Sequence, residues 1–257
     1  MINFSRIFYG LARFSRCGEK LGWKAAFQVY ILARALGCPV VVRLREVAVD
    51  FHLRGGAADL GSFASFYLGY PVIGGVEVRT VLDGGANIGD SAVLFAWKYS
   101  PELVVAVEPD KENFELLVKN TAAVPCVAPV CCALWSHDST VSLIASEGST
   151  VASSVRVAGP GDKVEARSIV SLARQYKLEG FDLVKLDIEG AEREVLGVNP
   201  SAWLKHCRIL ILELHDQISP GAGLAMIEAV RESGPFNIRN IGEYLVFVRC
   251  EKWDCND

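Results

Sequence analysis

The segment Val81-Leu-Asp-Gly-Gly-Ala-Asn-Ile-Gly-Asp90 decides the fold of this chain. It reads as a buried strand, a glycine-rich turn and the first residues of a helix. The next apolar run, Leu103-Val-Val-Ala-Val, closes on Glu108, 19 residues after Gly89. Glycines let a turn approach a ligand closely, and a carboxylate at the end of the second strand can hold two ribose hydroxyls. The layout therefore predicts a nucleotide-binding βαβ unit.

The turn indicates which nucleotide is bound. The nicotinamide fingerprint Gly-x-Gly-x-x-Gly places a pyrophosphate on the helix N-terminus, but a register starting at Gly84 or at Gly85 lacks at least one required glycine. Asp83 would repel a diphosphate. A carboxylate there suits a cation, and S-adenosylmethionine carries an ammonium and a sulfonium but no phosphate. The pattern Asp-x-Gly-x-Asn-x-Gly resembles the first motif of class I methyltransferases; a glycine turn without any ligand is the alternative.

Composition is that of a globular enzyme. The chain has 257 residues, 51% of them hydrophobic and 22% charged, which is enough for one large α/β core and an extension. The net charge of −4 gives no electrostatic reason to expect a nucleic acid partner. Apolar runs are short and broken by charges, and the N-terminus lacks a secretory pattern, so we expect no transmembrane segment and a cytoplasmic location. The eight cysteines include no Cys-x-x-Cys pair, which predicts buried, reduced thiols.

Two regions separate along the chain. Residues 1–75 show no regular alternation of strand and helix: Lys20 to Gly37 has helical periodicity, Val40 to Leu53 is β-rich, and Asp59 to Leu68 suits a short helix. We expect this α+β extension to cap the substrate side or to form an interface. Residues 76–257 form the predicted nucleotide-binding domain.

In the second region strands and helices alternate. Asp110 and Asn113 are suited to open the second helix as a capping pair. Residues 146–162 are rich in glycine and serine and predict a mobile loop near the ligand. The expected strands cover 80–83, 103–108, 126–133, 140–145, 181–187 and 208–214, the expected helices cover 89–99, 111–121, 169–176, 192–196 and 224–231, and residues 236–241 and 244–250 predict a terminal antiparallel hairpin.

A second motif, Phe181-Asp-Leu-Val-Lys-Leu-Asp-Ile-Glu-Gly-Ala-Glu192, gathers charge at the carboxyl end of a buried strand. Ligands bind at that edge of open α/β sheets. Helix-dipole stabilisation of ~0.3–1 kcal/mol accounts for an acid such as Glu192 in a first helical turn, but not for Asp187, which closes an apolar strand. Asp187 and Glu189 are therefore candidate catalytic residues.

Together these motifs resemble the FkbM family of class I methyltransferases, over roughly residues 78–215. Val107-Glu-Pro-Asp110, Asn113-Phe-Glu-Leu-Leu-Val-Lys-Asn120 and Ile209-Leu-Ile-Leu-Glu213 add to the likeness. The resemblance implies an α/β, Rossmann-like sheet, mostly parallel with a terminal antiparallel hairpin. It also implies S-adenosylmethionine as methyl donor and a hydroxyl of a sugar, polyketide or related metabolite as acceptor. Carried over by position, the cofactor-binding residues are Asp83, Gly84, Gly85, Asn87 and Gly89 at the methionine end, Glu108 at the ribose, and Ala133 and Leu134 near the adenine.

A histidine follows the strand next to Asp187. His215, with Glu213 and Asp216, can converge on Asp187 either as a general base cluster or as ligands for a divalent cation. We favour the metal-free form, with Asp187, Glu189 and His215 as catalytic candidates, because Lys185 supplies a cation nearby. A solvated histidine at a strand end is the alternative.

Two other functions and the choice of partner stay open at this point. The chain could be a non-catalytic S-adenosylmethionine-binding module or a nicotinamide-dependent oxidoreductase. We expect a small-molecule or glycan acceptor, chosen by the first 75 residues and the 146–162 loop, and a homo-oligomer is possible. The mix of Phe4, Phe8 and Leu11 with Arg6 and Arg13 could dock on a membrane surface, although packing on its own domain or on a dimer partner is favoured.

Overall fold

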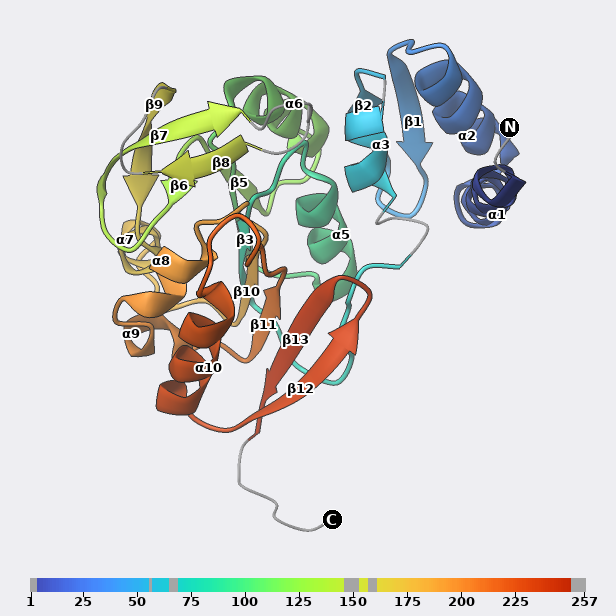
Figure 1. Cartoon of the computed structure of the whole chain (residues 1–257). Coiled ribbons are helices and arrows are strands. Elements are labelled where there is room, and N and C mark those ends of the chain that lie inside the picture. The colour runs from blue at the N-terminus through green and yellow to red at the C-terminus, as the bar shows by residue number, and fades with distance from the viewer. Residues whose placement is uncertain (1–3, 56, 65–68, 146–152, 157–160, 251–257) are drawn as a thin grey trace.

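A central seven-stranded sheet dominates the computed structural model, which describes residues 4–55, 57–64, 69–145, 153–156 and 161–250 (Figure 1). Strands β11, β10, β3, β4 and β5 pair with one another in parallel, and β13 pairs antiparallel with both β11 and β12. The order is β12 (Phe236–Ile241), β13 (Tyr244–Arg249), β11 (Ile209–Leu212), β10 (Leu183–Leu186), β3 (Thr80–Gly84), β4 (Leu103–Val107) and β5 (Val127–Val130). This arrangement confirms the predicted mostly parallel sheet with a terminal antiparallel hairpin.

Helices cover both faces of this sheet, as the continuous apolar runs of its central strands require. Residues that alternate along one strand face opposite layers: Leu82 packs with α7 (Ile169–Gln175), α8 (Glu192–Gly197), α9 (Ser201–Leu204) and α10 (Ala222–Ser233). Val81 packs with α5 (Asp90–Tyr99) and α6 (Lys111–Thr121) on the other face. The predicted cap of α6 is confirmed, because the Asp110 side chain accepts a hydrogen bond from the Asn113 amide at 3.0 Å.

The N-terminal extension has its own core around Phe51 and Phe63, whose ring centroids lie 5.3 Å apart. The single helix expected over 20–37 is wrong in its bounds: Gly22, at φ 91°, interrupts it. The extension comprises α1 (Phe4–Leu21), α2 (Trp23–Phe27), the π-helix η1 (Gln28–Ala35), the antiparallel hairpin β1 (Val40–Leu44) and β2 (Val49–Leu53), and α3 (Ala57–Phe63).

Two amide side chains on α6 join the extension to the sheet domain. The buried Asn120 on α6 accepts a hydrogen bond from the His52 amide at 2.7 Å and donates to the carbonyls of His52 and Ile88 at 3.1 and 2.9 Å. Asn113 accepts a bond from the Arg54 guanidinium at 2.8 Å. The extension is thereby fixed against α6 and the glycine-rich turn.

A second, four-stranded sheet includes part of the loop expected over 146–162. Residues 153–156 pair with β7, so the loop prediction is wrong there, whereas 146–152 and 157–160 lie outside the described residues. The expected strand 126–133 also divides, because its end belongs to this second sheet. Its order is β6 (Ala133–Leu134), β9 (Asp162–Arg167), β7 (Ser139–Ala145) and β8 (Ser153–Arg156).

The cysteines follow the prediction only in part. Cys17, Cys132 and Cys207 are buried thiols, but Cys38 and Cys131 are exposed. In the described part of the chain, no helix combines the length and apolar character needed to cross a membrane.

Candidate active site

A cavity of about 640 Å³ opens at the carboxyl ends of β3, β4, β10 and β11. This volume is within the range of small-molecule sites. Its wall combines the glycine-rich turn after β3, the acids that follow β4, β10 and β11, residues of the extension, and the β12–β13 hairpin. The lining among the described residues comprises Arg13, Gly61, Ser62, Ala64, Gly69, Tyr70, Gly85, Asn87, Asp90, Ser91, Val107, Glu108, Pro109, Asp110, Asn113, Ala133, Leu134, Lys185, Asp187, Ile188, Glu189, Glu213, Ile241, Gly242, Glu243 and Tyr244.

The glycine-rich turn is held against two neighbouring strands. The amides of Gly85 and Ala86 both donate to the Val107 carbonyl, at 3.0 and 2.9 Å. Gly85 has φ +71°, and a Cβ on it would lie 1.8 Å from the Asp187 carbonyl oxygen. Only glycine fits there, because any side chain would meet the backbone that carries Asp187. Gly89 begins α5 at φ +92° and packs against Leu117.

Glu108 closes β4 at the edge of the cavity. Its two carboxylate oxygens accept hydrogen bonds from the Asn87 amide at 2.8 Å and from the Asp110 amide at 3.0 Å. Burial raises the pKa of Glu108 to about 7, although these two amides lower it. Each oxygen can accept a further bond, so the carboxylate is fixed in place and can receive two hydroxyl groups from a ligand.

Lys185 is a buried cation between two acids. Its Nζ donates to the Gly85 carbonyl at 2.7 Å and lies 3.3 Å from Asp83 Oδ1 and 3.5 Å from Asp187 Oδ2. Burial would lower the pKa of Lys185, but the two carboxylates raise it above its ordinary value. Asp83 also accepts a bond from Ser91 Oγ at 2.7 Å. Asp83 therefore contacts Lys185 and Ser91, which line the cavity, and is absent from the described lining itself. The cation beside Asp83 is the ammonium group of Lys185.

The imidazole of His215 is fixed by Glu192. This fully buried carboxylate accepts bonds from the Ile188 and Gly190 amides at 3.2 and 2.9 Å and lies 2.7 Å from His215 Nδ1. It therefore organises both the imidazole and the turn after β10, in which Glu189 takes a left-handed φ of 49°. The other ring nitrogen, Nε2, lies 3.5 Å from Glu189 and 3.6 Å from Glu213.

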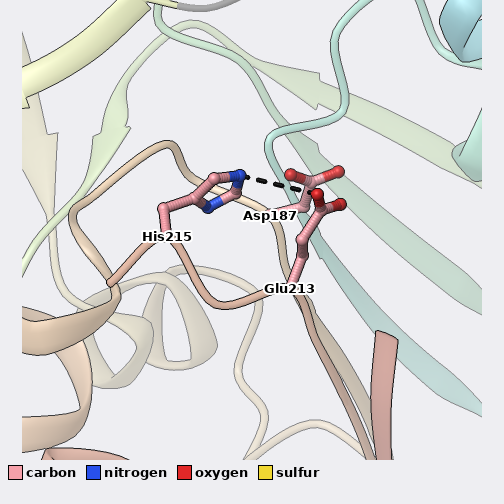
Figure 2. Close-up of side chains that lie close together, drawn as sticks. All are labelled: Asp187, Glu213 and His215. Atoms are coloured by element: carbon pink, nitrogen blue, oxygen red, sulfur yellow. Dashed lines mark ion pairs between the residues drawn. The ribbon is translucent and has the colours of Figure 1, made fainter. Parts of the chain in front are cut away.

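Asp187, Glu213 and His215 come together from the ends of β10 and β11 (Figure 2). One possible ligand atom from each lies within 4.8 Å of the others, which is the spacing a metal ion would require. Burial and Asp187 raise the pKa of Glu213 to about 7, while His215 lowers it. Burial would lower the pKa of His215, but Glu192 and Glu189 raise it to about 9. The neighbouring carboxylates therefore favour a protonated imidazole at neutral pH, and Glu213, like Glu108, has a pKa raised toward neutrality.

The structure divides the residues that the sequence singled out. Gly85, Asn87, Glu108, Ala133, Leu134, Asp187 and Glu189 line the cavity, whereas Asp83, Gly84, Gly89 and His215 are absent from its described lining and support residues that do line it. Sequence reasoning missed Ser62, Tyr70 and Tyr244 as wall residues, and it named Glu213 only as one member of a possible general base cluster or metal site. The rings of Tyr70 and Tyr244 lie 4.9 Å apart. Tyr70 follows the glycine at position 69, but no motif marks either tyrosine.

Comparison with known proteins agrees with this geometry. The sequence profile of the methyltransferase FkbM domain matches residues 83–244, which spans the glycine-rich turn, both acidic motifs and the start of β13. The chain belongs to the FkbM methyltransferase family. The predicted family membership is thereby confirmed, and the match assigns methyltransferase function in general terms.

Two relatives of this FkbM methyltransferase domain are informative. The methyltransferase sdnD of Sordaria araneosa is 27% identical over 194 residues, covering 62% of this chain and 73% of that protein. The crystal structure of the FkbM methyltransferase from Methylobacillus flagellatus shares the fold at 15% identity and a TM-score of 0.51. That match covers 95% of this chain but 60% of the other, so this chain spans little more than half the length of that relative.

Proposed function

We propose that this FkbM family member binds S-adenosylmethionine and methylates a hydroxyl oxygen of a sugar, polyketide or related metabolite. The observation that carries the proposal is a single cavity that joins a fixed carboxylate, Glu108, to the buried Lys185 and the half-buried Asp187 and Glu213. One end can hold a ribose, and the other can activate a hydroxyl group.

The residues at the first end fit the donor. Glu108 keeps one free acceptor site on each oxygen for the ribose hydroxyls. Ala133 and Leu134 give an apolar wall suited to the adenine, and Gly85 and Asn87 form the turn beside the methionine end. When bound, S-adenosylmethionine supplies an electrophilic methyl group. No phosphate-binding set accompanies it among the described lining residues, where acids outnumber cations; this argues against a nicotinamide dinucleotide.

At the second end, Glu213 is the group best suited to accept the hydroxyl proton. A general base works best when its pKa is near the operating pH, and the pKa of Glu213 is about 7. His215 already holds its proton at that pH, so we assign it to positioning: its charge lowers the pKa of Glu213 and of Glu189. Asp187, paired with Lys185 at 3.5 Å, orients the hydroxyl. A metal ion is not needed, since Lys185 and the imidazolium already compensate the acids.

The acceptor is chosen by walls that lie outside the donor end. Residues 1–75 serve as a cap on the substrate side, because Ser62 and Tyr70 of the extension line the cavity in contact with Asn87 and Tyr244 of the sheet domain. Glu189, Glu213 and Glu243 make this part of the wall anionic. A phosphorylated or carboxylated acceptor would be repelled there, and a neutral polyol or an amine-bearing compound would be accepted.

Turnover tests the proposal directly. The purified chain is titrated with S-adenosylmethionine by calorimetry and then screened against neutral glycosides and secondary metabolites for release of S-adenosylhomocysteine. With an accepted substrate, Glu213→Gln should lose ~10²-fold or more in kcat and should lose the decline of kcat/KM below about pH 7. Glu115→Gln, on the exposed face of α6, is the matched control. Donor binding without turnover on any acceptor would indicate a non-catalytic module, and a fluorescence response to a reduced nicotinamide would indicate an oxidoreductase.

A further inference from the structure

The outer end of the extension combines exposed apolar and basic side chains. Trp23, Phe27 and Ile31 follow one another at intervals of four along α2 and η1, so they share a helical face. They are 59%, 51% and 41% exposed. Figure 1 shows α1 and α2 on the side of the extension that faces away from the seven-stranded sheet. Trp23 contacts Phe14 of α1, with ring centroids 5.9 Å apart, but most of its surface stays exposed, and none of the three side chains lines the cavity.

Basic side chains flank the apolar face. Lys20, Lys24 and Arg34 are exposed, and with Trp23, Phe27 and Ile31 they define what we call the N-terminal surface. Residues 1–37 carry six Lys and Arg side chains and one acid, Glu19, and so have a charge of +5. The whole chain has a net charge of −4, so the other 220 residues carry −9. The molecule is strongly polarised, with its cationic end where its apolar residues are exposed.

We propose that the N-terminal surface docks the protein on an anionic phospholipid bilayer. Aromatic and aliphatic side chains on one face of a helix, flanked by Lys and Arg, are the composition of helices that lie in the plane of a membrane interface. The charge asymmetry orients the molecule, because the anionic sheet domain is repelled by the same surface that attracts the N-terminal one.

Two other occupants fit this surface less well. A second copy of the chain docking through the same face would bring two surfaces together that each carry three basic side chains, at a cost in repulsion. A nucleic acid would be held by phosphate contacts, which leave the exposed Trp23, Phe27 and Ile31 without a role. A bilayer interface uses both the charges and the apolar side chains. Arg13 of α1 lines the cavity, so a docked α1 would lie beside the site.

Co-sedimentation of the full-length chain with vesicles tests this proposal. We expect binding to vesicles of phosphatidylcholine mixed with phosphatidylserine, weak binding to phosphatidylcholine alone, and loss of binding at high salt. Lys20→Gln with Lys24→Gln should weaken binding about 25-fold, at about fivefold for each charge, which is the factor equivalent to ~1 kcal/mol per basic residue. Phe27→Ser with Ile31→Ser should weaken it at least about tenfold.

Matched variants elsewhere on the surface serve as controls. Leu224→Ser with Ile227→Ser removes two apolar side chains of α10 that are 62% and 59% exposed, and Lys119→Gln with Lys205→Gln removes two exposed charges. Both should bind vesicles as the wild type does. Equal binding to neutral and anionic vesicles, or equal losses in the controls, would overturn the proposal. So would a dimer in sedimentation velocity that Phe27→Ser with Ile31→Ser converts to a monomer without any vesicle binding.

Discussion

Replacing Glu192 with glutamine tests how the acidic cluster is organised. Glu192 is fully buried and accepts three hydrogen bonds, from two amides of the turn after β10 and from His215. Glutamine has nearly the same shape, but it keeps one acceptor oxygen in place of two, so it can accept from only one of the two amides, and it carries no charge to stabilise the imidazolium. Glu192→Gln should therefore lower the pKa of His215 and destabilise the fold without removing the turn.

The size of the effect follows from the raised pKa. Burial would lower the pKa of His215, yet Glu192 and Glu189 raise it from 6.5 to about 9. That difference corresponds to ~3 kcal/mol of stabilisation of the protonated imidazole. Because Glu189 and Asp187, which also raise this pKa, remain in the variant, we assign about 2 kcal/mol of this to Glu192. A group whose pKa is higher in the folded chain stabilises the fold fully below its unfolded pKa, and this stability is lost as pH rises through the folded pKa.

Urea denaturation at several pH values measures this dependence. The difference in unfolding free energy between wild type and Glu192→Gln should be largest near about pH 6 and should shrink by about pH 10. The chain has four histidines, so NMR titration can follow His215 directly. Glu194→Gln, on the same helix, is the matched control and should leave the His215 titration unchanged. A stability difference that is constant from about pH 6 to 10, or an unaltered pKa of His215 in Glu192→Gln, would refute the reasoning.

Three further predictions address the donor end, the turn and the metal question. Glu108→Ala should weaken S-adenosylmethionine by ~10-fold or more in calorimetry while the circular dichroism stays unchanged, since each bond to a carboxylate contributes ~1.5–3 kcal/mol; wild-type affinity would contradict the role of this strand end. Gly85→Ala should lower the unfolding free energy by ~3 kcal/mol or more, because its Cβ would lie 1.8 Å from the Asp187 carbonyl. Gly74→Ala, whose added Cβ would meet no heavy atom within 4 Å, should change it little. Treatment with a chelator should leave methyl transfer unchanged, and recovery of a lost activity on adding magnesium would instead make Asp187 a metal ligand.

The sequence predicted the central sheet because, in that region, the local sequence pattern favours the same strands and helices that the folded structure contains. The run from Val81 to Asp90 has one reading as strand, turn and helix, and Asp110 caps its helix through contacts only three residues away. Strand β8 was missed because its pairing with β7 is distant in sequence and a short Ser-Ser-Val-Arg segment has no alternating pattern. The break at Gly22 was missed because the apolar periodicity continues on both sides of it.

The sequence identified several residues of the site, but it did not predict the contacts between them. Asp83 was expected beside a cationic ligand, and the structure places Lys185 there at 3.3 Å, a pairing between neighbouring strands that one sequence does not reveal. His215 was expected as a base because an ordinary imidazole titrates near neutrality. Its surroundings, Glu192 above all, change that protonation, and such surroundings arise only when β10 and β11 lie side by side. Tyr70 and Tyr244 reach the cavity from regions without any recognisable motif.

The amide bonds of Asn120 bear on how such enzymes can be recombined. The recognised family region begins at position 83, which suggests that the preceding segment could be exchanged as a separate module. Yet Asn120, well inside that region, pairs with the backbone of His52 as a neighbouring strand would, and Asn113 holds Arg54. A chimera that grafts a foreign extension without matching these two positions would leave the buried Asn120 amide with only its bond to the Ile88 carbonyl, at a cost of ~1–3 kcal/mol. A functional exchange of the extension must therefore also include the residues of α6 that contact it, which lie inside the recognised family region.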